Sequence, residues 1–285
     1  MRNHEKKEAI EISSSSKKKK ASNQSVLLCC KIFFFESRSR APLNAIERAV
    51  RLDPETMIVN KFEDRAYNRT RFTLVSYVIH DNTGSAIYSP LQQTVLAMVE
   101  AAYGTINLEQ HSGTHPRLGV VDDIILHPLA RVSLDEAAWL AKAVATDIGN
   151  RFQVPLFLYG AAHLTGKALH SIRRELGYYR PNFMGNQWAG WTMPEILAIK
   201  PDEGPTRISR ARGITMIGAR PWVGLYNIAC MLLEPNRVGR DRVQSQVGML
   251  AAQEGLDVET GYFTNSSPEM ILDKYLNLIS ANRAE

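Results

Sequence analysis

A regular succession of apolar segments between residues 26 and 159 most constrains the fold of this chain. Apolar or alternating runs predict strands over residues 26–36, 56–62, 70–80, 119–126 and 154–159. Apolar residues at helical spacing predict helices over residues 42–52, 91–103 and 133–150. The last helix opens with Ser133 and Glu136, the spacing of a capping box. The first six elements follow the ferredoxin-like order, so the chain is predicted to be α+β.

The second half of the chain has a weaker pattern. We expect a helix over residues 166–176, apolar strand material over residues 214–233, a helix over 238–254, a strand over 256–263 and a helix over 268–280. The apolar run from Trp222 to Leu233 is longer than a mean strand of about five or six residues. It is therefore either one long buried strand or two strands that have lost the segment between them.

Composition and charge give little support to a nucleic-acid or membrane partner. Residues 1–25 are rich in Lys and Ser, so we expect a disordered tail, and much of the net charge of +5 lies there. No basic stripe interleaved with aromatic residues follows, which does not favour a nucleic-acid partner. The apolar run Val26–Phe35 is too short to span a membrane and contains Lys31. Three cysteines without paired spacing fit a reducing compartment, and we expect a cytoplasmic protein.

The segment Asn107–Leu126, NLEQHSGTHPRLGVVDDIIL, holds the leading candidate for chemistry. His115 can accept or donate a proton near neutral pH, and Arg117 offers a planar fork for a carboxylate. A loop histidine that caps a helix or bonds a backbone carbonyl is the alternative. His111 precedes His115 by four positions, but without a nearby cysteine the pair is a weak signal for zinc.

Two other places could bind an anion. Arg69, where a polar loop enters a predicted strand, could clamp an anionic substrate or make a surface salt bridge. Gly204, Pro205 and Gly213 enclose a cationic segment, which suits either a polyanionic ligand or a solvent-exposed hinge.

A longer block of sequence resembles a known family. HSGTHPRLGVVDDIILHPL, followed by SLDEAAWLAKAVATDIG and VPLFLYGAA, resembles the formiminotransferase domain of the formiminotransferase-cyclodeaminase family. That family has the pattern H-x-G-x-H-P-R-[LM]-G-x-[LV]-D-x-x-P-F-x-P. The resemblance continues upstream through Asn68-Arg69-Thr70 and downstream through Gly204-Pro205 to Gly213, and it covers most of residues 26–227.

The resemblance implies two ferredoxin-like subdomains in tandem, with helices packed on mixed or antiparallel sheets and a folate site in the groove between them. We place the subdomains at residues 26–205 and 206–285. The implied reaction moves a formimino group from N-formiminoglutamate to tetrahydrofolate, which is the acceptor substrate. His115 would be catalytic, and Arg69, Arg117, Gly204, Pro205 and Gly213 would bind substrate or folate. Both partners are then small molecules, and a homodimer is left open.

The chain departs from the family in three places. Phe33–Arg38 retains only part of the N-F-S-E-G-R signature, Phe62 stands where the family has an active-site aspartate, and Arg207–Arg212 replaces a Ser/Pro/Trp-containing stretch. A catalytically impaired folate-binding or regulatory protein of the same fold is therefore the alternative function. In addition, Ile228 and Ala229 abut where the family has a helix and a strand, which predicts a shortened, incomplete second subdomain.

Overall fold

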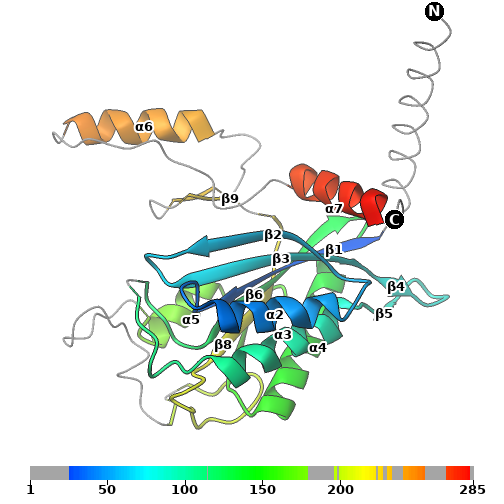
Figure 1. Cartoon of the computed structure of the whole chain (residues 1–285), viewed down its shortest axis with the longest axis horizontal. Helices are drawn as coiled ribbons and strands as arrows, with labels where there is room; N and C mark the ends of the chain where they lie inside the picture. Colours follow the sequence, from blue (N-terminus) through cyan, green and yellow to red (C-terminus); the bar gives the residue numbers. More distant parts are fainter. Residues whose placement is uncertain are drawn as a thin grey trace, which may run out of the picture. The chain divides into compact units, whose positions relative to one another are not determined.

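A computed structural model describes residues 26–113, 115–178, 196–197, 199–222, 224–226, 230–232, 240–253 and 268–282. The chain divides into two compact units, one formed by residues 1–220 with 275–285 and the other by residues 221–274. Each unit is described separately, with the helix and strand labels of Figure 1.

The first unit is built on a six-stranded sheet with the strand order β2-β3-β1-β6-β8-β7. Its strands are β1 (Leu27–Phe34), β2 (Met57–Asp64), β3 (Arg69–Tyr77), β6 (Val121–Ala130), β7 (Leu156–Gly160) and β8 (Thr215–Ala219). The pairs β2–β3, β3–β1 and β1–β6 are antiparallel, whereas β6–β8 and β8–β7 are parallel. Every residue of β1 is buried, which fits the continuous apolar run of a central strand.

Three helices cover one face of this sheet: α2 (Arg40–Arg51), α3 (Leu91–Thr105) and α4 (Leu134–Phe152). Alternate residues of β1, including Cys30, Ile32 and Phe34, pack with buried residues of these helices in the main core. In α4 the side chain of Ser133 accepts from the backbone N–H of Glu136, and the Glu136 side chain accepts from the Ser133 backbone N–H. The predicted capping box is confirmed, and it fixes where α4 begins.

The opposite face carries a smaller core at the β6–β8–β7 end of the sheet. The short helix α5 (Leu169–Glu175) contributes Ile172 to this core, which also contains Phe33 of β1 and Ile125 of β6. Leu118, Tyr159 and Tyr178 join the same cluster. The two faces of one sheet therefore support two separate apolar clusters.

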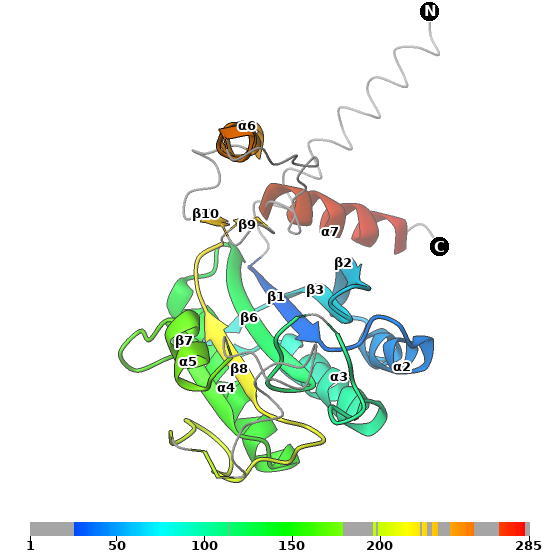
Figure 2. The same cartoon turned by 90° about the vertical axis from the view of Figure 1, so that its left-hand side faces the viewer.

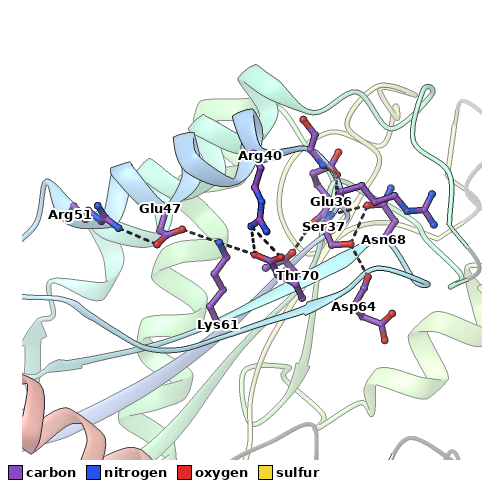
Figure 3. A network of polar contacts seen from close by, with 12 residues as sticks. Glu36, Ser37, Arg40, Glu47, Arg51, Lys61, Asp64, Asn68 and Thr70 are labelled. Atoms are coloured by element: carbon purple, nitrogen blue, oxygen red, sulfur yellow. Dashed lines mark hydrogen bonds and ion pairs between the residues drawn. The ribbon is translucent and has the colours of Figure 1, made fainter.

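Charged side chains join α2 to the edge strand β2. Lys61 on β2 forms ion pairs with Glu47 of α2 at 2.9 Å and with Glu63 at 3.0 Å. Arg40 at the start of α2 contacts Glu63 at 3.1 Å. Figure 3 shows this chain of contacts running from the helix to the strand. Because several charges act together in a network, they hold the helix more firmly than an isolated surface pair would.

The structure confirms the α+β class and the ferredoxin-like order of the first six predicted elements, since β1, α2, β2, β3, α3 and β6 appear in that order. The predicted strand over residues 70–80 ends earlier, because Val78 leaves the ladder. Ile79–His80 forms β4, which pairs with β5 (Ala86–Tyr88) in a small hairpin. Strand β8 lies beyond residue 205, so the sheet includes residues that the sequence assigned to the second subdomain; that division stays a prediction.

In the apolar run from Trp222 to Leu233, the structure has two short strands, β9 (Gly224–Tyr226) and β10 (Cys230–Leu232), paired antiparallel. Of the two alternatives left open by the sequence, one long strand is thus excluded, since Cys230 pairs back onto Tyr226. Helices α6 (Arg240–Gln253) and α7 (Pro268–Asn282) confirm the two predicted C-terminal helices. The predicted strand over residues 256–263 and the tail over residues 1–25 lie outside the described residues. No described helix has the length and apolar character needed to cross a membrane.

Candidate functional site

The candidate site lies at the edge of the sheet where β1 ends and β6 begins. Phe34 of β1 pairs with Thr70 at the start of β3 and with Val121 at the start of β6. The loop before β6, the turn between β2 and β3, and the segment after β1 therefore meet at this edge. These segments carry the His-Pro-Arg triplet, Arg69 and the Glu36-Ser37-Arg38 sequence.

Asn68 connects the three segments through its own hydrogen bonds. Its side-chain oxygen accepts from the Ser37 backbone N–H at 2.8 Å, and its side-chain NH2 donates to the Ser112 carbonyl at 2.9 Å. Its backbone carbonyl accepts from the Nε2–H of His111 at 3.0 Å. Asn68 has a φ of 51°, a conformation that Asn tolerates better than most residues. Figure 3 shows its contact with Ser37.

Gly113 allows the two motif-bearing loops to approach each other closely. A Cβ atom at Gly113 would lie 2.4 Å from the carbonyl oxygen of Tyr67. A side chain at this position would therefore displace the backbone that presents Asn68 and Arg69. The glycine of the H-x-G-x-H-P-R pattern is explained by this approach.

His115 is partly buried and its imidazole is oriented by a local hydrogen bond. The Nδ1–H group donates to the Pro116 carbonyl at 2.7 Å, which leaves Nε2 as the nitrogen that can accept a proton. Three aromatic rings surround it: the distances from the centre of the imidazole to the ring centres are 4.8 Å for Tyr67, 5.7 Å for Phe35 and 6.0 Å for Tyr178. Burial, with the positive charge of Arg69 second, lowers the pKa of His115 to about 3. The imidazole is thus neutral at physiological pH and has a defined tautomer.

A carboxylate beside His115 comes from a β-bulge. Phe33 pairs with Asp123 and Phe34 pairs with Val121, so Asp122 has no partner in the β1–β6 ladder. Bulges re-aim side chains and are common next to active sites. Asp122 is fully buried, and its Oδ2 atom accepts from the guanidinium groups of Arg69 and of Arg173, the latter at 3.0 Å.

The two arginines keep Asp122 ionised. Burial alone would raise the pKa of the Asp122 carboxyl, but Arg173 and Arg69 outweigh burial and leave the pKa below its ordinary value. Burial would likewise lower the pKa of Arg173, but Asp122, together with the smaller effects of Tyr178, Asp123 and Tyr159, outweighs burial and raises it. Two cations and one anion therefore stand beside a neutral imidazole.

The same aromatic rings contact the histidine and the arginines. The Cζ atom of Arg69 lies 4.1 Å from the centre of the Phe33 ring and 5.5 Å from that of Phe35. The Cζ atom of Arg173 lies 4.5 Å from the centre of the Tyr178 ring. Because Phe35 and Tyr178 also contact His115, the three polar side chains are held in one cluster.

Arg117 is fully buried and has few partners. One of its terminal nitrogens donates to the Gly113 carbonyl at 3.2 Å, whereas Nε and Nη2 have no hydrogen-bond partner in the described part of the chain. Burial lowers its pKa. The nearby His111 is also buried, and burial, followed by the charge of Arg117, lowers its pKa to about 4.

Three of the six predicted site residues, His115, Arg69 and Arg117, thus lie at one edge of the sheet. Gly213 adjoins them: it has a φ of +72°, and a Cβ atom there would lie 2.1 Å from the Leu118 carbonyl oxygen. Gly204 (φ +78°) and the following Pro205 lie elsewhere, since a Cβ atom at Gly204 would lie 2.2 Å from the Val154 carbonyl oxygen. At both glycines the backbone of another segment approaches so closely that a side chain would not fit, which explains why these residues are glycines. Their binding of folate stays a prediction.

The structure adds two residues to those predicted from sequence. The sequence motifs do not single out Asp122 or Arg173, although Asp122 stands five residues after Arg117 within the segment Asn107–Leu126. Arg173 lies on the seven-residue helix α5, where no motif distinguishes it from Arg174. Among the described residues, no group of three or more His, Cys, Asp or Glu could hold a metal ion.

Comparison with known proteins assigns the family. The family described as the formiminotransferase domain, N-terminal subdomain, matches residues 27–220. The chain belongs to the formiminotransferase family. The match covers the whole six-stranded sheet and every residue of the candidate site, including Asp122 and Arg173.

Relatives of this formiminotransferase-family chain differ in length. It is 39% identical to a formiminotransferase cyclodeaminase-like protein of Arabidopsis thaliana, an alignment that covers 87% of this chain and 96% of the relative. It is 28% identical to the formimidoyltransferase-cyclodeaminase of Sus scrofa, over 68% of this chain and 33% of that protein. It is 27% identical to the glutamate formimidoyltransferase of Streptococcus pyogenes serotype M1, over 68% of this chain and 59% of that protein. The chain therefore matches only part of the latter two proteins.

Proposed function

We propose that this chain transfers a formimino group from N-formiminoglutamate to the N5 nitrogen of tetrahydrofolate. Membership of the formiminotransferase family supports the transferase class. The observation that carries the proposal is the state of His115: a neutral imidazole whose Nδ1–H is bonded to Pro116, which leaves Nε2 as a proton acceptor. A general base of this kind is what an attacking amine nitrogen needs.

The proposed reaction uses one proton twice. The N5 nitrogen of tetrahydrofolate attacks the formimino carbon, and its proton passes to Nε2 of His115. The bond between that carbon and the glutamate nitrogen then breaks, and His115 returns the proton to this nitrogen, so that glutamate leaves. The acceptor keeps the formimino group, and His115 ends in its starting state.

A pKa of about 3 makes His115 a weak base in the protein without substrate. N-formiminoglutamate carries carboxylates, and an anion beside Arg69 would offset the positive charge that lowers this pKa. Binding of the donor would therefore raise the basicity of His115 in the complex in which a base is needed. Arg69, whose side chain is partly exposed, and the fully buried Arg117 are the predicted cations that could supply such binding.

The direct test is turnover by the purified chain with tetrahydrofolate and N-formiminoglutamate. We expect wild-type protein to form 5-formiminotetrahydrofolate and His115→Ala to lose at least about a hundredfold in rate, since general-base catalysis contributes roughly 10²- to 10⁴-fold. His163→Ala, in the loop after β7, is the matched control. Turnover that survives in His115→Ala at the wild-type rate would contradict the proposed role.

One observation favours a second candidate function, folate binding without turnover. Phe62 stands where the family has an active-site aspartate, and its ring lies 5.4 Å from the guanidinium carbon of the buried Arg71. An aromatic ring cannot supply the carboxylate that would balance charge there. Calorimetric binding of folate by a chain that shows no turnover would support this candidate, and a gain of turnover in Phe62→Asp would identify the missing carboxylate as the cause.

A further inference from the structure

The carboxylate of Asp122 holds two arginines with a single oxygen. Oδ2 accepts from both Arg69 and Arg173, and Oδ1 has no hydrogen-bond partner in the described part of the chain. Asp122 and these two arginines together carry one net positive charge; the neighbouring Asp123 carboxyl, whose pKa burial raises, also acts on Arg173 and accepts a hydrogen bond from Tyr159 at 2.9 Å. An excess of charge that is largely removed from water is costly unless an ion of opposite sign compensates it.

The two arginines also have N–H donors that no described residue accepts. The Nε–H groups of Arg69 and Arg173 are buried and lack an acceptor among the described residues. An arginine offers five N–H donors in a fixed fork, and a buried donor without an acceptor costs about 1–3 kcal/mol. Buried donors of this kind point to a ligand that supplies oxygen atoms.

The cluster is accessible and lies beside the imidazole. The side chains of Arg69 and Arg173 are 16% and 14% exposed, whereas Asp122 is 0% exposed. Arg173 covers the Tyr178 ring, and Arg69 lies over the Phe35 ring, the two rings that also contact His115. An anion that pairs with both guanidinium groups would therefore lie next to His115.

We propose that Arg173, together with Arg69, binds a carboxylate of the amino-acid donor, and that Asp122 positions the two guanidinium groups for this contact. The proposal rests on the proposed function for the identity of the donor, but the carboxylate site itself is set by the cluster. Planar guanidinium groups match a carboxylate in two-point contacts, which a lysine cannot reproduce. Arg173 is then a substrate-binding residue that lies outside the His-Pro-Arg motif, and Asp122 is a positioning residue.

The test separates donor binding from catalysis. Arg173→Gln should raise the KM for N-formiminoglutamate roughly ten- to hundredfold, the range for a lost hydrogen bond to a charged group, and leave the KM for tetrahydrofolate unchanged. Arg173→Lys should fall between wild type and Arg173→Gln, because it keeps the charge and loses the fork. Arg174→Gln, an exposed neighbour on α5, is the matched control and should behave as wild type.

Binding of L-glutamate, measured by calorimetry, makes the outcome independent of turnover. Glutamate binding that is lost in Arg173→Gln and retained in Arg174→Gln supports the carboxylate site even if the chain shows no turnover, in which case only the proposed function fails. A fall in kcat with an unchanged KM for the donor, or a raised KM for tetrahydrofolate alone, would overturn the proposal. So would wild-type protein that neither binds glutamate nor turns over the donor.

Removal of one arginine could also destabilise the buried carboxylate. If Arg173→Gln does not fold, judged by circular dichroism, the double variant Arg173→Gln/Asp122→Asn replaces the buried carboxylate that has lost one of its two arginines with a neutral amide and restores the net charge of the wild-type cluster. The double variant should fold and lack glutamate binding. Glutamate binding at wild-type affinity in the folded double variant would overturn the proposal.

Discussion

In the proposed mechanism, the protonation of His115 depends on whether an anion occupies the site. With no anion bound, burial and Arg69 lower its pKa to about 3, and Asp122 and Arg173 are the other charges acting on it. A bound carboxylate should raise this pKa. Since kcat/KM reports the free enzyme and kcat reports the complex, we expect the acidic limb of kcat at a higher pH than that of kcat/KM. Initial rates across the acidic pH range measure both limbs, and coincident limbs would contradict the coupling.

His111 makes a different, structural contribution that depends on pH. Its pKa is lowered to about 4 in the folded protein, against an unfolded value of about 6.5, so the unfolded chain binds the proton first. Stability is therefore lost as the pH falls from about 6.5 toward 4, by up to about 3 kcal/mol from this residue. Urea unfolding at pH 7.5 and 4.5 should show a smaller loss in His111→Gln than in wild type. The exposed His170→Gln is the control, and an equal loss in all three proteins would refute this account.

The residues of the site differ in how far sequence could predict them. His115, Arg69 and Arg117 lie in short motifs whose residue types suggest proton transfer and anion binding. The alternative given for His115, a loop histidine that bonds a backbone carbonyl, also holds, because its Nδ1–H donates to the Pro116 carbonyl. Arg173 could not be predicted, because its role depends on the fold bringing α5 to the bulge at Asp122, 51 residues away in the chain.

At the scale of the elements, the segment before β6 and the segment before β8 can approach each other closely only because residue 119 is a glycine. A Cβ atom at Gly119 would lie 1.9 Å from the carbonyl oxygen of Ile214. Gly119→Ala should therefore push β8 away from β6 and destabilise the protein by about 1–3 kcal/mol, the usual cost of overpacking. Thermal unfolding measures the change. Gly104→Ala, in α3 with open space around the new methyl group, should be neutral or stabilising; equal effects would contradict the steric cause.

Local sequence signals were sufficient for most elements of the first unit. Helical and alternating periodicity marked α2, α3, α4 and the antiparallel strands, because each of these buries one face against a core that the pattern reveals. The insertion of β8 between β6 and β7 was not predictable in this way. It depends on pairing between residues such as Ile124 and Ile217, and no local pattern specifies which strand becomes the neighbour.

For the whole molecule, the central strand provides a built-in probe of unfolding. Cys29 and Cys30 are 0% exposed, and burial raises the pKa of the Cys29 thiol to about 12. Both thiols should resist alkylation at pH 8 in the native protein and react only as fast as the sheet opens. Mass spectrometry of a Cys230→Ser variant, which leaves these two thiols alone, measures the rate with and without denaturant. Rapid labelling in native buffer would show that the sheet opens locally.

The alignment with a relative bears on whether the second half of the chain is shortened. The alignment with the Arabidopsis relative runs over 290 positions but covers only 87% of this 285-residue chain, so that relative contains residues with no counterpart here. That the absent segment lies between Ile228 and Ala229 stays a prediction. Transcript sequencing across that junction should find a longer form. Recovery of the contiguous form alone would refute an annotation or splicing origin of the shortening.

The strand order also determines when the six-stranded sheet can be completed during synthesis. β7 pairs only with β8 in the sheet, yet it leaves the ribosome more than fifty residues earlier, as the bounds Leu156–Gly160 and Thr215–Ala219 require. Until β8 emerges, β6 has an open edge and β7 has no ladder partner (Figure 2). An unpaired apolar strand is a site for aggregation, so the nascent chain is most prone to aggregate over this interval. A chain released by a ribosome that stalls there would lack the strand that joins β6 to β7.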